Sequence, residues 1–135
     1  MSIPTSKVHL AIFSEPFLTL VLNGKKKVDS RFSKNRIAPY GKVVKNDLVL
    51  IKRSGGKIIG SFIVQKVRFV EIKNKIILEE LKKKYSRLIC ADVNPDFWKK
   101  RVSAKYATFI WIGEISHKNP IVRSAPGRSG WRVLK

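Results

Sequence analysis

The chain of 135 residues has few acidic side chains, two histidines and a single cysteine. One cysteine excludes an intrachain disulfide, and we expect Cys90 to be a small buried apolar residue in a cytoplasmic protein. One cysteine and two distant histidines, His9 and His117, do not supply the usual tetrahedral zinc ligands. The sequence therefore predicts no metal site, and nothing in it indicates a cofactor.

Long apolar runs are also missing. No stretch approaches the roughly 20 residues that cross a bilayer. The sequence shows no basic amphipathic helix with a broad apolar face, and its start lacks the features of a signal peptide. We expect no membrane partner. Because 44% of the residues are hydrophobic, we expect a single folded domain over residues 1–135, and a monomer.

Positive charge is in large excess: 29 Lys and Arg stand against 9 Asp and Glu, a formal net charge of +20. This exceeds what solubility requires, and it favours a nucleic-acid partner. The charge favours RNA or DNA alike, and because the major groove of A-form RNA is deep and narrow, a protein cleft is better suited to a single-stranded or flipped-out base. The cations expected to contact the nucleic-acid backbone are Lys27, Lys34, Arg36, Arg123, Arg128 and Arg132.

Apolar spacing and turn residues predict the secondary structure. A strand is expected over 9–13, followed by a helix with Ser14 as N-cap and Gly24 as a left-handed C-cap. A strand follows over 27–32, and Gly60 is a candidate β-bulge. Further strands are expected over 48–53, 58–72, 106–115 and 130–134, and helices over 77–88 and 96–102.

The apolar residues of the 77–88 helix repeat at helical spacing, so they form one buried face opposite a basic one. These are Leu78, Leu81, Tyr85 and Leu88. Strands outnumber helices along the chain. We predict an α+β fold, a small mixed β-barrel of five to six strands with two to three flanking helices.

The stretch GKKKVDSR, residues 24–31, combines three lysines, a carboxylate and an arginine. Strand alternation places Asp29 and Arg31 on one face, with Lys26 at the turn above. A carboxylate between two cations stays ionised and can hold both, while Arg31 offers a planar fork to a phosphate or a base edge. The alternative is a solvated turn, in which the lysines favour the helix C-terminus and Asp29–Arg31 is a weak surface ion pair.

This stretch resembles the signature G-x-K-x-x-E-x-R of the ASCH domain family, in the PUA-like superfamily. Gly24, Lys26 and Arg31 match it, and Asp29 stands in place of the longer Glu. FSEPFLTLVLNG, KNDLVLI and IIGSFIV add to the resemblance, which covers about residues 10–70, and YATFIWIGEI and GRSGWRVL fit the closing strands. The resemblance implies a PUA-like barrel with a cleft beside the first helix.

The resemblance also implies that RNA or a nucleotide binds in this cleft. The expected ligand-binding residues are Gly24, Lys25, Lys26, Asp29, Arg31 and Tyr40. The alternative is a small enzyme acting on RNA or a modified nucleoside, of the ribonuclease or acetylcytidine amidohydrolase type, with Lys26 and Asp29 as catalytic residues. A desolvated lysine can act as base or nucleophile, whereas Asp29, which has no hydroxyl, would act as a base or attack through its carboxylate. A third class is a protein-interaction module with an anionic partner.

Three aromatic residues have competing interpretations. Trp131 is expected to fill the end of the barrel, although its Arg- and Gly-rich surroundings would also suit base stacking. Trp98 is expected to pack a helix. Tyr40, in the loop after the signature, is the candidate stacking residue outside the core.

Overall fold

The computed structural model of the chain describes residues 6–118 and 130–134. It contains the strands β1 (Val8–Phe13), β2 (Val28–Ser33), β3 (Leu48–Arg53), β4 (Ile58–Glu71), β5 (Tyr106–Ser116) and β6 (Trp131–Val133). Two α-helices, α1 (Phe17–Leu22) and α2 (Lys75–Tyr85), and two 3-10 turns, η1 (Ala91–Val93) and η2 (Lys99–Arg101), complete the elements.

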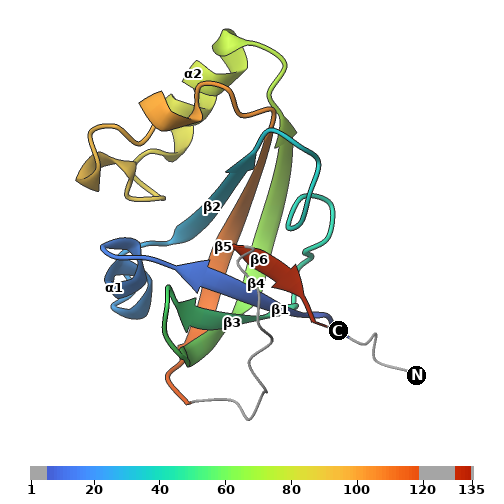
Figure 1. The fold of residues 1–135 in the computed structure, drawn as a ribbon, viewed down its shortest axis with the longest axis vertical. Helices are drawn as coiled ribbons and strands as arrows, with labels where there is room; N and C mark the ends of the chain where they lie inside the picture. The colour runs from blue at the N-terminus through green and yellow to red at the C-terminus, as the bar shows by residue number, and fades with distance from the viewer. Residues whose placement is uncertain (1–5, 119–129, 135) are drawn as a thin grey trace.

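The strands form one mixed sheet in the order β2-β5-β4-β3-β1-β6. β1 and β3 pair in parallel, and the other neighbours are antiparallel. The sheet curls, so that β1, β3 and β6 run across the direction of the long β4 and β5 (Figure 1). The predicted small mixed α+β barrel is confirmed as a half-barrel of six strands, with β2 and β6 as its edges in the part of the chain that the structure describes.

Helix α1 begins later than the sequence predicts. It starts at Phe17, and the predicted N-cap at Ser14 is wrong, because the N-cap position is Pro16, which makes no side-chain cap bond. Glu15 instead accepts from the N–H and the hydroxyl of Thr19, at 2.8 and 2.6 Å. The end of the helix is as predicted, since Gly24 follows it with φ of +80°, a conformation that favours glycine.

A bulge lies where β3 meets β4. Ile51 pairs with Gly60 and Lys52 with Ile58, so one residue of β4 has no partner in the ladder. A Cβ on Gly60 would lie 2.6 Å from the carbonyl oxygen of Ser116. The predicted bulge at Gly60 is confirmed, and the glycine is required because another strand passes close to its backbone.

Helix α2 packs on the outer side of the sheet. Asn74 caps it by accepting from the N–H of Ile77 at 3.0 Å. Its buried face contains Leu78, Leu81 and Tyr85, as predicted. The prediction for Leu88 is wrong: the helix ends at Tyr85, Leu88 is 36% exposed, and Ile89 is buried in its place.

The segment after α2 differs from the predicted helix over 96–102. It has only a short 3-10 turn at Lys99–Arg101, preceded by a second one at Ala91–Val93. Cys90 adopts a left-handed conformation with φ of +58° and is half-buried, so the expectation of a buried cysteine is wrong. Trp98 packs as predicted, with its ring 5.6 Å from that of Phe32.

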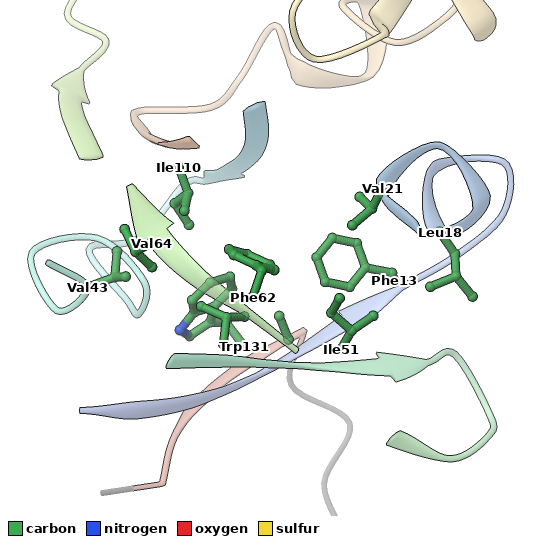
Figure 2. Close-up of a cluster of buried hydrophobic side chains, with 11 residues drawn as sticks. Phe13, Leu18, Val21, Val43, Ile51, Phe62, Val64, Ile110 and Trp131 are labelled. Carbon is green, nitrogen blue, oxygen red and sulfur yellow. The ribbon is translucent and has the colours of Figure 1, made fainter. Parts of the chain in front are cut away.

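Two hydrophobic clusters stabilise the fold. The first fills the curl of the sheet, where Phe13, Phe62 and Trp131 lie together (Figure 2). Trp131 is 4% exposed, which confirms its predicted place in the barrel. The second cluster lies under α2, where the rings of Tyr85 and Phe109 stack at 4.1 Å. None of the helices within 6–118 and 130–134 is long and apolar enough to span a membrane.

Candidate functional site

A cavity of about 640 Å³ opens along the edge of the half-barrel. Its walls come from the end of β1, the start of α1, strand β2, the 37–39 loop, the 97–101 turn and residues 130–131. The cavity therefore lies between β2 and β6, the two edge strands. Residues from both ends of the chain meet there.

Asp29 is the centre of the charged group in this cavity. It is 3% exposed, and each of its carboxylate oxygens faces one cation. Nε of Arg31 lies 2.9 Å from Oδ2, and Nζ of Lys26 lies 3.9 Å from Oδ1. The structure thus brings together three of the residues predicted for the site. The solvated-turn alternative is wrong for Lys26 and Asp29, because both are buried.

Lys26 is more deeply placed than the sequence indicates. Its backbone N–H donates to the carbonyl of Leu20 at 2.9 Å, which folds the chain back against α1. Its ammonium lies 4.1 Å from the centre of the Phe17 ring, and the residue is 4% exposed. Burial lowers the pKa of Lys26, while the charge of Asp29 opposes this shift. Lys26 is therefore a poorly hydrated amine beside a carboxylate.

Arg31 spans the opening between the two edge strands. Its guanidinium lies 4.8 Å from the ring centre of Phe13 and 5.3 Å from that of Trp131. Nη1 donates to the carbonyl of Gly130 at 3.3 Å. The guanidinium thus lies near two aromatic rings, and its Nε–H group donates to Asp29, which orients it.

Arg101 is a site residue that the sequence analysis missed. Its guanidinium lies 3.6 Å from the centre of the Phe97 ring, and Nη1 donates to the Phe97 carbonyl at 2.7 Å. Burial lowers the pKa of Arg101. Its sequence signal is the run WKKR, for which the sequence predicts a helix. With Lys26, Arg31 and Lys100, it makes four cations against the carboxylates of Asp29 and Glu15 among the described lining residues.

Three other predicted ligand-binding residues are not among the described residues that line the cavity: Gly24, Lys25 and Tyr40. Lys25 is exposed, and its backbone N–H donates to Oδ1 of Asn23 at 3.0 Å. The Tyr40 ring packs against Tyr106, with ring centres 4.9 Å apart. It also packs against the Phe69 ring at 5.3 Å, whereas the preceding residue, Pro39, lines the cavity.

The predicted backbone-contacting cations are distributed over several surfaces. Lys27, Lys34 and Arg36 are exposed, and the Arg36 guanidinium lies 5.5 Å from the Tyr40 ring centre. Arg132 is half-buried in β6. Arg123 and Arg128 lie outside the described residues.

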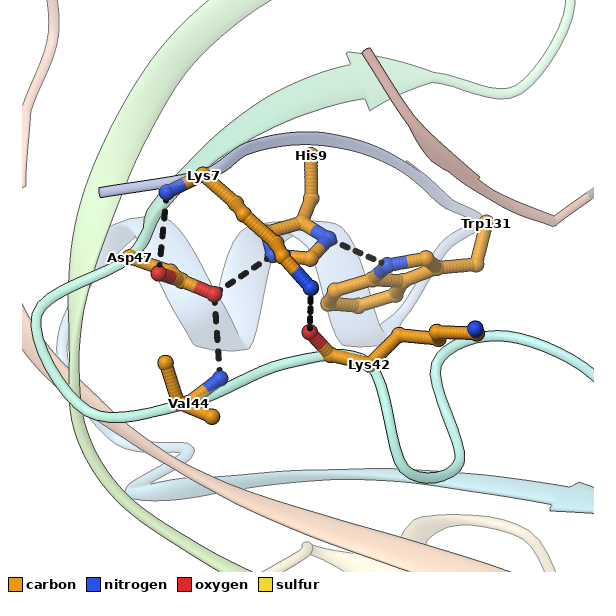
Figure 3. Close-up of polar contacts among 6 residues, drawn as sticks. All are labelled: Lys7, His9, Lys42, Val44, Asp47 and Trp131. Carbon is orange, nitrogen blue, oxygen red and sulfur yellow. Dashed lines mark hydrogen bonds and ion pairs between the residues drawn. The ribbon is translucent and has the colours of Figure 1, made fainter. Parts of the chain in front are cut away.

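A buried polar network supports the cavity wall from behind (Figure 3). The indole N–H of Trp131 donates to Nδ1 of His9 at 3.1 Å, so Nε2 carries the imidazole proton and donates to Asp47 at 2.8 Å. Asp47 also accepts from the backbone N–H groups of Lys7 and Val44, at 3.1 and 3.0 Å. The network fixes the orientation of the Trp131 ring, which lines the cavity.

No protein-family model matches the sequence, and no curated protein matches it. The structure is similar to the crystal structure of ASCH from Zymomonas mobilis, with a TM-score of 0.66 and 14% identity over 96% of this chain and 88% of that chain. A variant of that protein gives a TM-score of 0.68 and 16% identity over 98% and 92% of the two chains. This chain has the ASCH-domain fold. In this ASCH fold, the cavity lies at the opening of the half-barrel beside α1.

The ASCH fold of this chain is also similar, more distantly, to the crystal structure of hypothetical protein PH0355. The TM-score is 0.51 and the identity 18%, over 77% of this chain and 95% of that chain.

Proposed function

We propose that this protein binds RNA, with one nucleotide in the cavity beside α1. The observation that carries the proposal is the group of Lys26, Asp29 and Arg31 inside a cavity lined by four cations. The volume of about 640 Å³ is within the range of roughly 300–1,000 Å³ that is typical of ligand pockets. The net charge of +20 adds long-range attraction for a polyanion.

The cations of the cavity differ in role. Arg31 is oriented by Asp29 and keeps N–H groups for a phosphate or a base edge. Lys100 is exposed at the cavity wall and suits a phosphate contact. Exposed Lys27, Lys34 and Arg36 extend the positive surface for the flanking backbone. These outer contacts contribute affinity without sequence preference.

A binding titration with a short single-stranded RNA tests the proposal. At about 50 mM salt we expect binding, and at about 200 mM a large loss of affinity, because the release of counterions on binding is less favourable at higher salt. Arg31→Ala should weaken binding about tenfold or more, since hydrogen bonds to charged groups are the strong ones. Lys73→Ala, which removes an exposed lysine that is not among the described lining residues, is the matched control. Absence of binding at low salt, or binding with no salt dependence, contradicts the proposal.

A second function, an enzyme acting on RNA or a modified nucleoside, is favoured by one observation. The amine of Lys26 is buried beside a carboxylate and its pKa is lowered, which is the environment of a catalytic lysine. The protein is incubated with acetylated cytidine and with single-stranded RNA. We expect turnover that Lys26→Ala abolishes and Lys73→Ala retains; turnover that survives Lys26→Ala places the reaction elsewhere.

A further inference from the structure

The outer edge of β2 presents backbone groups that the sheet does not use. The N–H of Val28 points away from β5, because it donates to the carbonyl of Leu88 at 3.2 Å. Backbone groups alternate in direction along a strand with a period of two residues. The N–H and C=O groups of Ser30 and Phe32 therefore also point away from β5.

The opposite set of groups confirms this alternation. The carbonyl of Lys27 accepts from the N–H of Ile112 at 3.0 Å, and that of Ser33 accepts from the N–H of Lys105 at 2.9 Å. Both donors belong to β5 or lie just before it. Odd-numbered residues of this stretch thus bond toward β5, and even-numbered residues face the open side.

The four outward groups of Ser30 and Phe32 have no hydrogen-bond partner within residues 6–118 and 130–134. Both residues are half-buried, and both line the cavity. A backbone donor or acceptor in such a place is free to bond to water or to a ligand in the cavity. The open edge of β2 is therefore a row of alternating donors and acceptors along one wall of the cavity.

We propose that this edge of β2 reads the base of the bound nucleotide, through the backbone N–H and C=O groups of Ser30 and Phe32. The proposal rests on the proposed function and extends it from phosphate attraction to base contact. A nucleobase carries donors and acceptors side by side on its Watson–Crick edge, and a strand edge offers the complementary pattern. Phe32, which is half-buried and lines the cavity, adds apolar surface beside this edge.

The same edge would also accept an extended peptide as an additional strand. The lining favours a nucleotide, because its four cations outnumber its two carboxylates. Neutral peptide backbone needs no such charge, whereas each nucleotide of RNA brings one phosphate. A peptide is therefore the competing outcome in the test below.

Ser30→Pro tests the proposal, because proline removes the outward N–H and is tolerated on the open side of an edge strand. Ser30→Ala keeps that N–H and is the control for the lost hydroxyl. Each variant is titrated with a short single-stranded RNA and with an abasic oligomer of the same length. We expect Ser30→Pro to weaken RNA binding about fivefold, the loss of one hydrogen bond, and to leave abasic binding unchanged. Ser30→Ala keeps the outward N–H, so it should bind RNA more tightly than Ser30→Pro does.

The outcomes separate this proposal from the proposed function. Equal RNA affinity of folded Ser30→Pro and wild type overturns base reading at β2, while RNA binding stands. If Ser30→Pro loses the same affinity for RNA and for the abasic oligomer, base reading is also overturned, because the variant then acts on contacts that do not involve the base. Absence of RNA binding by the wild type overturns the proposed function itself.

The proposal can also be tested on the wild type alone, by an NMR spectrum of its backbone amide groups. We expect a nucleoside monophosphate to shift the amide signals of Ser30 and Phe32, and ribose 5-phosphate to leave them in place. Signals that do not move with the nucleotide overturn the proposal, as do signals that move only with an unstructured acidic peptide.

Discussion

The indole N–H of Trp131 donates to Nδ1 of His9 across 3.1 Å, and this bond links the last strand of the barrel to the first. The two rings lie with their centres 5.5 Å apart. The Arg31 guanidinium lies 5.3 Å from the centre of the Trp131 ring. The bond to His9 therefore orients a ring that lines the cavity and that Arg31 contacts. A neutral imidazole with its proton on Nε2 is the form that satisfies both of its partners.

Replacement of this imidazole is expected to destabilise the fold. His9→Phe keeps a ring of similar size but removes the acceptor of the Trp131 indole N–H and one of the two donors to Oδ2 of Asp47, which keeps its bond from the Val44 N–H. Loss of hydrogen bonds at buried polar groups costs roughly 1–3 kcal/mol, so the free energy of unfolding should fall by about that amount. Urea unfolding measures it, with His117→Phe at an exposed position as the control. Equal stability of the two variants would show that the network contributes little.

Removal of the buried ammonium should stabilise the fold while impairing the site. Lys26→Met keeps the packing on Phe17 but removes a charge whose desolvation exceeds its attraction to Asp29, as the lowered pKa of Lys26 shows. Asp29 retains Arg31 at 2.9 Å. The gain is expected to be on the order of 1 kcal/mol, with weaker RNA binding. Thermal unfolding beside the exposed-site variant Lys25→Met checks this, and a lower melting temperature would contradict it.

The lowered pKa of Lys26 predicts that the stability of the fold depends on pH in the alkaline range. Because the pKa of Lys26 is lower in the fold than in the unfolded chain, the unfolded chain binds more protons between these two values. Stability of the wild type therefore rises with pH across that window, while Lys26→Met lacks this rise. The advantage of Lys26→Met should shrink as pH increases toward the ordinary pKa of lysine. Urea titrations of both proteins at several alkaline pH values measure the difference, and a constant difference would contradict the shift.

The glycine of the bulge is expected to tolerate no side chain. In Gly60→Ala the new methyl would lie 2.6 Å from the carbonyl oxygen of Ser116, a backbone atom that cannot move alone. We expect a loss of about 1–3 kcal/mol, as for other overpacked positions. In Gly56→Ala the nearest atoms, Cβ and Cδ of Arg53, lie at 3.2 Å, a contact 0.6 Å longer than that at Gly60, so this variant is the milder control. Comparable melting temperatures for the two variants would refute the steric argument.

Local patterns in the sequence predicted the strands and the central part of the site. Alternation in KVDSRF placed Asp29 and Arg31 on one face, because strand alternation depends only on neighbouring residues. The burial of Lys26 could not be predicted in this way, since it depends on packing against Phe17 and on the turn that carries Arg101. Neither contact leaves a periodic signal in the sequence.

Long-range polar contacts were missed for a related reason. His9 stands in an apolar run and gave no sign of a role, because its partners Asp47 and Trp131 are 38 and 122 residues away. The error at Leu88 was of another kind. Helical spacing continues to that residue, but the chain leaves the helix after Tyr85 and reaches the left-handed conformation of Cys90. Spacing alone does not show where a helix ends.

The bond from Arg31 to the Gly130 carbonyl has a consequence for β6. The same carbonyl accepts from the N–H of Ile12 at 3.0 Å, so it joins β1 and β2 to the residue that precedes β6. We expect an anion that withdraws the guanidinium from Gly130 to remove the β2 half of this junction. If this loosens β6, thermodynamic reciprocity requires that loosening of β6 change the affinity for the anion by the same factor. Occupancy of the cavity and attachment of β6 would then be coupled.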